Sequence, residues 1–171
     1  MNEVDRFIET WEREAAKTVK LLAALPHDQY DFRPDAEGRS LGELAWHLAE
    51  CDAYSPYAIE IGEFSRERRP PGIERPRNVE ELAPAFDRLH REAVQRVRKL
   101  KAEDLDRSLT FFSGQTFTVR DLLWNMVLLH GIHHRGQLAL MCRLAGGRPP
   151  ALFGPTREER PLPRPKVTAS A

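Results

Sequence analysis

A helical periodicity recurs four times along the 171 residues and constrains the fold more than any other feature of the sequence. Apolar residues return at intervals of three and four positions, so each segment carries one apolar stripe when it is wound into a helix. Such a stripe is buried only when it packs against another part of the chain. Four amphipathic helices bury their stripes most simply as a bundle. We therefore predict an all-α four-helix bundle, with helices at residues 2–25, 40–62, 79–101 and 118–144.

Local residues predict where three of these helices begin. Ser40 and Glu43 have the spacing of a capping box, in which each side chain bonds a backbone N–H of the first turn. Thr118 and Asp121 form a second capping pair at the start of the last helix. Pro84 falls in the first turns of the third helix, where proline is tolerated because the early N–H groups lack helical partners.

Prolines and glycines predict where the helices stop. Pro26 should end the first helix, because proline cannot continue the backbone hydrogen bonding of a helix. Pro56 should kink the second helix or end it early, and Gly62 is the expected stop. The glycine pair at 146–147 should end the last helix.

The segments between and beyond the helices carry further predictions. Residues 62–78 hold three prolines and should form a loop long enough for a crossover connection. Residues 109–118 alternate weakly, which fits a small β-hairpin or an extended loop. The tail, residues 155–171, is rich in proline and charge and is predicted to be disordered, which leaves residues 1–154 as the folded domain.

Composition and charge exclude several classes of protein. Basic and acidic residues number 26 each, so the basic excess of a nucleic-acid-binding protein is missing. The longest strongly apolar stretch is far too short to span a bilayer, and no signal peptide is evident, so we expect neither a nucleic-acid nor a membrane partner and a cytoplasmic location. Cys51 and Cys142 fall on apolar faces of predicted helices and are expected to be free, buried thiols.

Three of the six histidines lie within five residues of the last predicted helix. His130 and His134 are spaced i and i+4, which places two imidazoles on one helical face, close enough to share a metal ion. His133 lies on the other flank of the same stripe, so periodicity does not choose between the pairs 130/134 and 130/133. Because Gly131 follows His130, the HExxH pattern of zinc proteases is not met. The stripe predicted to face the interior comprises Val119, Leu122, Leu123, Met126, His130, Gln137, Met141 and Leu144.

A third ligand must come from another helix, and His47 is the best candidate. It lies beside the apolar stripe of the second helix, in a dry setting where electrostatic interactions are strong. Three histidines with open coordination positions are typical of a catalytic zinc site rather than a closed structural one. A single histidine in a core is more often a packing residue than a metal ligand. The spacing of the three histidines therefore makes the metal site a hypothesis only. His27 and His90 are expected in a loop and near a helix surface, with no role.

The second and fourth predicted helices carry motifs that resemble those of the DinB/YfiT-like superfamily. One is Leu44–Leu48, which reads LAWHL, and the more specific one is His130–Leu138, which reads HGIHHRGQL. The glycine and proline ending at residues 146–150 is also similar to the family pattern. The resemblance extends over about residues 2–153 and agrees with the helix order and the long second loop.

Membership of that superfamily would imply an up-down-down-up bundle with one divalent metal ion. Carried over residue by residue, the resemblance implies the ligands His47, His130 and His134, and so selects His134 over His133. Zinc or nickel is the metal that the resemblance implies, and a homodimer is the implied assembly. Some relatives are S-transferases or isomerases that use a low-molecular-weight thiol other than glutathione.

We therefore expect a metal-dependent enzyme acting on a small molecule, such as a low-molecular-weight-thiol S-transferase or a hydrolase-like enzyme. The alternatives are a non-catalytic metal-binding stress-response protein, in which the ion ties two helices together, and a bundle that binds nothing in the cell. No catalytic residue can be assigned from the sequence.

Several residues near the motifs carry weaker predictions. Arg135 and Arg120 could bind a carboxylate on the thiol, although a salt bridge is the more common role. Gln137 and His133 are candidates for contacts behind the ligand rings. Four aromatic residues are expected to pack in the core rather than to line a substrate pocket: Trp46, Tyr54, Tyr57 and Trp124.

Overall fold

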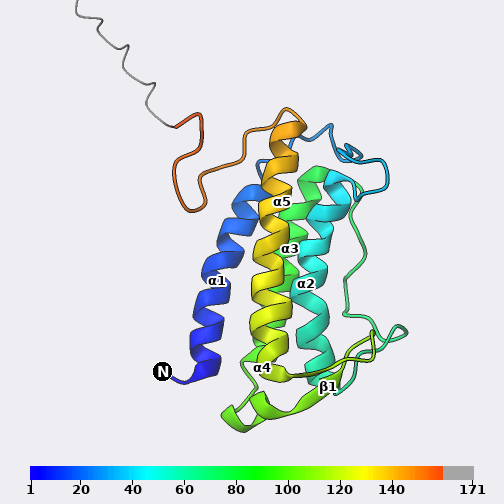
Figure 1. Ribbon diagram of the computed structural model, residues 1–171, viewed down its shortest axis with the longest axis vertical. Coiled ribbons are helices and arrows are strands. Elements are labelled where there is room, and N and C mark those ends of the chain that lie inside the picture. The colour runs from blue at the N-terminus through cyan, green and yellow to red at the C-terminus, as the bar shows by residue number, and fades with distance from the viewer. Residues whose placement is uncertain (160–171) are drawn as a thin grey trace, which may run out of the picture.

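The computed structural model describes residues 1–159 and consists of four long helices packed side by side (Figure 1). This confirms the predicted all-α four-helix bundle. The first three helices are α1 (Glu3–Leu22), α2 (Leu41–Ile61) and α3 (Val79–Val97). The fourth is one continuous run of α4 (Val119–Asp121), the π-helix η2 (Leu122–Leu129) and α5 (His130–Leu144). Small additions between α3 and α4 are η1 (Ala102–Asp106), β1 (Ser108–Thr110) and β2 (Thr116–Thr118).

The connections give the predicted up-down-down-up order (Figure 1). The α1 helix rises from the end that holds the N-terminus, α2 and α3 both descend, and the fourth helix rises again. Two parallel neighbours need a crossover between them, and residues 62–78 supply it by climbing the length of the bundle. β1 and β2 pair antiparallel, so the hairpin is the one of the two predicted alternatives that the structure has.

Local chemistry fixes the helix ends largely as predicted. The Glu43 N–H donates to Ser40 Oγ (3.2 Å) and the Ser40 N–H donates to Glu43 Oε2 (2.8 Å), so the capping box is complete. This backbone bond, together with Arg33, lowers the pKa of Glu43 to about 2. Gly62 ends α2 with φ of 84°, a left-handed conformation that suits glycine. Pro56 does not end α2, which continues for five residues beyond it to Ile61.

The core is mostly apolar, and one group of polar side chains lies in its centre. Asp52 accepts a hydrogen bond from Trp11 Nε1 (3.1 Å) and lies 2.7 Å from His90 Nδ1. His90 is 5% exposed, so its predicted place near a helix surface was wrong. Cys51 and Cys142 are free and buried, as predicted.

The apolar stripe predicted for the last helix was wrong at two of its positions, whereas Met141 is buried as predicted. Gln137 and Leu144 are exposed, whereas Val127, Leu128 and Arg135 are buried. The cause lies in η2, because the wider turns of a π-helix rotate the residues after it relative to a regular α-helix. Periodicity counted at 3.6 residues per turn therefore misplaced the face that α5 turns inward.

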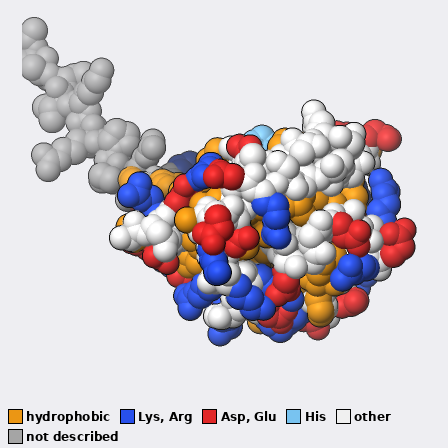
Figure 2. Space-filling view, turned by 90° about the horizontal axis from the view of Figure 1, so that it is seen from below, with side chains coloured by type: hydrophobic (Ala, Val, Ile, Leu, Met, Phe, Trp, Pro, Cys, Tyr) orange, Lys and Arg blue, Asp and Glu red, His pale blue; other side chains and the backbone are white. Residues whose placement is uncertain are grey.

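Surface charges of both signs are interspersed with apolar side chains on the end of the bundle seen in Figure 2. This mixture agrees with the formal net charge of zero. Among residues 1–159, no helix combines the length and the hydropathy that crossing a bilayer requires. Glu158, in the described part of the predicted tail, pairs with Arg143 (2.5 Å), and the rest of that tail, residues 160–171, lies outside the described residues.

We predict that Gly42→Ala destabilises the fold by about 1–3 kcal/mol, because a β-carbon there would overlap the Tyr30 ring. The ring atoms lie 2.4 Å from the added atom, and the Tyr30 hydroxyl is held by its bond to the Pro76 carbonyl (2.6 Å). Chemical denaturation measures the change. Gly136→Ala is the control, since nothing lies within 4 Å of its β-carbon and alanine favours helix. Equal stability of the Gly42→Ala protein and the wild type would contradict the tight contact.

Candidate metal centre

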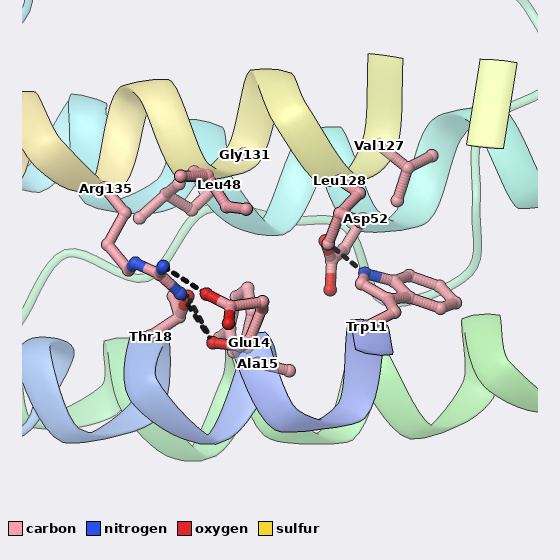
Figure 3. A pocket seen from close by; sticks show the side chains of 12 residues that line it. Trp11, Glu14, Ala15, Thr18, Leu48, Asp52, Val127, Leu128, Gly131 and Arg135 are labelled. Carbon is pink, nitrogen blue, oxygen red and sulfur yellow. Dashed lines mark hydrogen bonds and ion pairs between the residues drawn. The ribbon is translucent and has the colours of Figure 1, made fainter. Parts of the chain in front are cut away.

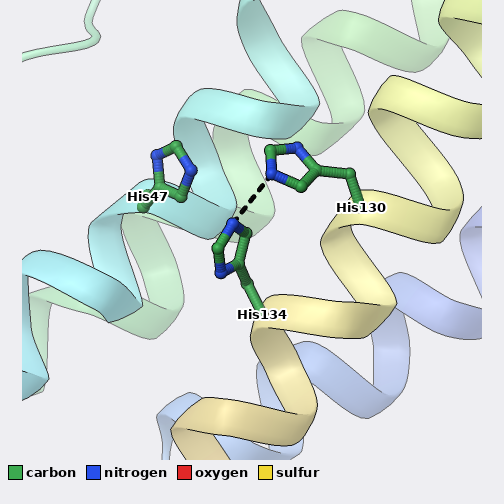
Figure 4. Close-up of side chains that lie close together, drawn as sticks. All are labelled: His47, His130 and His134. Atoms are coloured by element: carbon green, nitrogen blue, oxygen red, sulfur yellow. Dashed lines mark hydrogen bonds between the residues drawn. The ribbon is translucent and has the colours of Figure 1, made fainter.

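Three histidines from two helices meet between α2 and α5 (Figure 4). His47 comes from the first half of α2, His130 is the first residue of α5, and His134 follows one turn later. One nitrogen from each ring lies within 4.8 Å of the others. These are the three residues that the resemblance implied as ligands, and the structure brings all three together.

Each imidazole is held from behind through its Nδ1 atom. Glu50 Oε2 lies 3.0 Å from Nδ1 of His47, and Gln137 Oε1 lies 2.7 Å from Nδ1 of His134. Cys51 Sγ lies 3.5 Å from Nδ1 of His130, a weaker contact. A carboxylate or amide oxygen accepts a hydrogen bond from Nδ1–H, which leaves the Nε2 lone pair of the same ring available. Glu50 and Gln137 therefore favour, at His47 and His134, the tautomer that a metal-binding histidine needs.

The spacing of the Nε2 atoms fits a small cation. His130 Nε2 and His134 Nε2 are 2.8 Å apart. Tetrahedral zinc with bonds of 2.0–2.1 Å would hold two nitrogens about 3.3 Å apart, so a slight opening suffices. The His47 ring centroid is 4.7 Å from that of His134 and 5.6 Å from that of His130. Three neutral nitrogen donors in this arrangement match the donor set of an open zinc site.

The surroundings keep two of the rings uncharged near neutral pH. Burial lowers the pKa of His134 to about 4, and nearby positive charge on His47 acts in the same direction. Burial, followed by the same influence of His47, also lowers the pKa of His130. A proton therefore competes poorly for these two nitrogens at pH 7, and the lone pairs stay available for a cation.

The neighbouring residues of the motif divide between the cluster and the rest of the bundle. His133 is exposed and does not belong to the group of three, so the pair that helical spacing left open is 130/134. Gln137 lies behind His134, where it was predicted to lie. Sequence reasoning missed Glu50 and Cys51, although both follow His47 by one helical turn and that spacing was a usable signal.

Arg135 reaches from α5 towards Glu14 and Thr18 of α1 (Figure 3). It is 2% exposed, and its guanidinium pairs with the Glu14 carboxylate and donates to the Glu14 carbonyl oxygen (2.7 Å). Burial by itself would raise the pKa of Glu14, but hydrogen bonds from Lys17 and Arg135 lower it. Arg135 is therefore engaged within the bundle and does not reach the cluster.

Other residues singled out in the sequence lie outside the cluster. Arg120 pairs with Glu3 and Asp106 at the lower end of the bundle. Trp46 is 2% exposed and donates its indole N–H to the Ile73 carbonyl (3.2 Å), which matches the predicted core role.

We predict that Glu14→Ala destabilises the fold by about 3–5 kcal/mol, because it leaves the buried Arg135 charge without its carboxylate. Chemical denaturation of both proteins measures the loss. Glu9→Ala is the matched control on the same helix, since Glu9 pairs with Arg13 (3.8 Å) in an exposed position and should contribute less than about 1 kcal/mol. Similar losses of unfolding free energy in the two variants would show that the buried Glu14–Arg135 pair contributes no more to stability than the exposed Glu9–Arg13 pair.

We also predict that acid weakens the metal-free fold below about pH 6.5. The pKa of His134 is about 4 in the folded chain and about 6.5 when unfolded, so the unfolded state takes up a proton first as the pH falls. The melting temperature of chelator-treated protein should therefore drop between about pH 7 and pH 5, above the usual carboxylate range. His134→Gln should flatten this part of the curve. A flat wild-type curve would contradict the low pKa.

Comparison with known proteins agrees with the fold. The chain is 29% identical over 159 residues to the uncharacterized protein YrdA of Bacillus subtilis (strain 168), covering 91% of each chain. A crystal structure of the DinB-like protein YjoA from Bacillus subtilis superposes with a TM-score of 0.68 at 24% identity, covering 86% of this chain and 96% of that one. A DinB-like protein from Bacillus cereus ATCC 10987 gives a TM-score of 0.69 at 21% identity, covering 85% and 94%. The sequence pattern of the DinB family matches residues 1–164, and the chain therefore belongs to the DinB family.

Proposed function

We propose that this DinB-family protein binds one divalent metal ion through Nε2 of His47, His130 and His134 and uses it in catalysis on a small molecule. One observation carries the proposal. All three rings have a partner at Nδ1, and their Nε2 atoms converge on one point between two helices. Imidazole suits zinc and nickel, and three protein ligands leave a position open for a water or a substrate.

A divalent cation at this point would lower the pKa of a coordinated water or thiol and so supply a nucleophile near neutral pH. Transfer of a low-molecular-weight thiol is the reaction class that we favour, with hydrolysis as the second use of the same chemistry. The protein's own part is to hold the rings. Glu50 and Gln137 fix two of the tautomers, while the partly buried position limits the access of water.

A non-catalytic role has one observation in its favour. The cluster joins α2 to α5, whose histidines are more than 80 residues apart in sequence, so a bound ion would act as a cross-link. In that case the ion would mainly stabilise the bundle, as expected of a metal-binding stress-response protein. Association as a homodimer stays a prediction that light scattering can measure.

We predict about one divalent ion per chain in protein purified without an affinity tag, as measured by elemental analysis. His130→Ala and His134→Ala should each lose the ion, because two imidazoles bind a cation far more weakly than three. Metal at a hundred times its dissociation constant should stabilise the wild type by about 2.7 kcal/mol. His133→Ala is the control, since His133 is exposed and outside the cluster, and it should keep its ion. Equal metal content in all the variants would sink the proposed site.

The same variants separate the two roles. A catalytic site should lose thiol transfer to electrophiles together with the ion, whatever happens to the melting temperature. Transfer that survives in both His130→Ala and His134→Ala would exclude an enzyme working through this cluster. Metal-dependent stability with no activity towards several thiols and electrophiles would favour the cross-linking role.

A further inference from the structure

A cavity of about 250 Å³ adjoins the histidine cluster, and His47 and His130 form part of its wall. Most of the rest of the wall is apolar or weakly polar. It is built by Cys51, Tyr54, Phe111, Phe112 and Met126, and it is completed by Ser55 and by Glu50, whose carboxylate lies 3.0 Å from His47 Nδ1. A ligand that reached the Nε2 atoms from this side would therefore pass along an apolar surface.

Three separate parts of the chain build this wall. Cys51 and Tyr54 come from α2, Met126 comes from the π-helical segment η2, and Phe111 and Phe112 come from the turn between β1 and β2. The turn is held in place by aromatic packing. The ring of Phe64 lies edge-on to Phe111 (4.8 Å between centroids) and Phe112 (5.4 Å). Phe112 is nonetheless 40% exposed, which is unusual for a phenylalanine that only fills a core.

Two arginines contact side chains of the cavity wall. Arg69 donates its Nε–H to the Tyr54 hydroxyl (3.1 Å), and the Arg66 guanidinium lies 5.7 Å from the Phe112 ring centroid. Neither of these two arginines forms an ion pair with a carboxylate within residues 1–159, whereas Arg68 between them pairs with Glu63 (3.1 Å). Two guanidinium groups resting on wall residues therefore remain available for an anion.

We infer that this cavity binds the organic part of the substrate, and that the substrate is an amphipathic organic anion. Its metal-binding group lies at His47 and His130, its aromatic or branched aliphatic body fills the cavity, and its anionic group lies at Arg66 and Arg69. The inference rests on the proposed function. A volume of about 250 Å³ is small beside the roughly 300–1,000 Å³ of most small-molecule sites, so it suits one ring with short substituents rather than a dinucleotide.

Three hydroxamic acids test the inference, because they share one metal-binding group and differ in the rest. Acetohydroxamate carries a methyl group, benzohydroxamate carries a phenyl ring, and 4-carboxybenzohydroxamate adds a carboxylate at the far end. Calorimetry on the zinc-loaded full-length chain gives the dissociation constants. We expect the phenyl compound to bind about tenfold tighter than the methyl compound, because its ring leaves water. The 4-carboxy compound should gain about threefold more at low salt.

Variants assign each gain to its residues. Phe112→Ala should remove most of the phenyl gain and leave the zinc content and the affinity for acetohydroxamate unchanged. Phe153→Ala is its control, since Phe153 is 73% exposed and does not line the cavity. Arg66→Gln combined with Arg69→Gln should abolish the gain from the carboxylate alone. Arg68→Gln is the matched control in the same segment and should keep that gain.

The affinities of the wild-type chain for the three hydroxamates test the inference without any variant. Equal affinities for acetohydroxamate and benzohydroxamate would overturn the inference, and so would weaker binding of the 4-carboxy compound. A chain that holds zinc and binds acetohydroxamate without preferring the ring contradicts the cavity while the proposed metal site stands. A chain that holds no metal overturns the proposed function and the inference together.

Discussion

The rotation of the last helix about its own axis is the constraint on which the candidate centre depends. Arg135 is buried against α1, where the Glu14 carboxylate and carbonyl oxygen receive its guanidinium (Figure 3). Successive residues of an α-helix are turned by about 100°, so holding Arg135 towards α1 leaves His134 facing α2. A different rotation would carry His134 and His130 away from His47. A buried ion pair on one side of the helix thus orients the ligand atoms on the other.

The α2 helix serves both the centre and the core through adjacent residues. Cys51 lies behind His130, while Asp52 points into the bundle, where Trp11 donates to it and His90 contacts it. A buried carboxylate is costly unless such partners surround it, so this group favours one position of α2 against α1 and α3. His90 Nε2 has no hydrogen-bond partner among the described residues, and its ring packs between Trp11 and Phe86. The register that places His47 is therefore set by polar contacts as well as by apolar burial.

Sequence reasoning succeeded where the physics is local. The capping box at Ser40, the left-handed glycine at position 62 and the hairpin after α3 depend on residues a few positions apart, and all were predictable. It failed where one irregular segment changes the phase of a long helix. The eight residues of η2, apolar except for Asn125, give no sign in their periodicity that they adopt π-helical turns, so Gln137 was assigned to the interior. The salt bridge considered the more common role for Arg135 is the one the structure has, with Glu14.

The sequence by itself determined the class of fold and a short list of donor atoms. Helical periodicity and capping residues specify four amphipathic helices, and the motif spacing brings His130 and His134 to one face. The sequence also named His47 as the best third donor, and only the tertiary structure decided that its ring meets the other two and that an aromatic cavity adjoins the cluster. The physical reason is that these properties depend on segments more than 50 residues apart in sequence, such as Cys51, which contacts His130, and Tyr54, which lines the same cavity as Phe111. Those contacts depend on how each helix is rotated about its axis and on its register against its neighbours. Neither property follows from the spacing of residues within one segment.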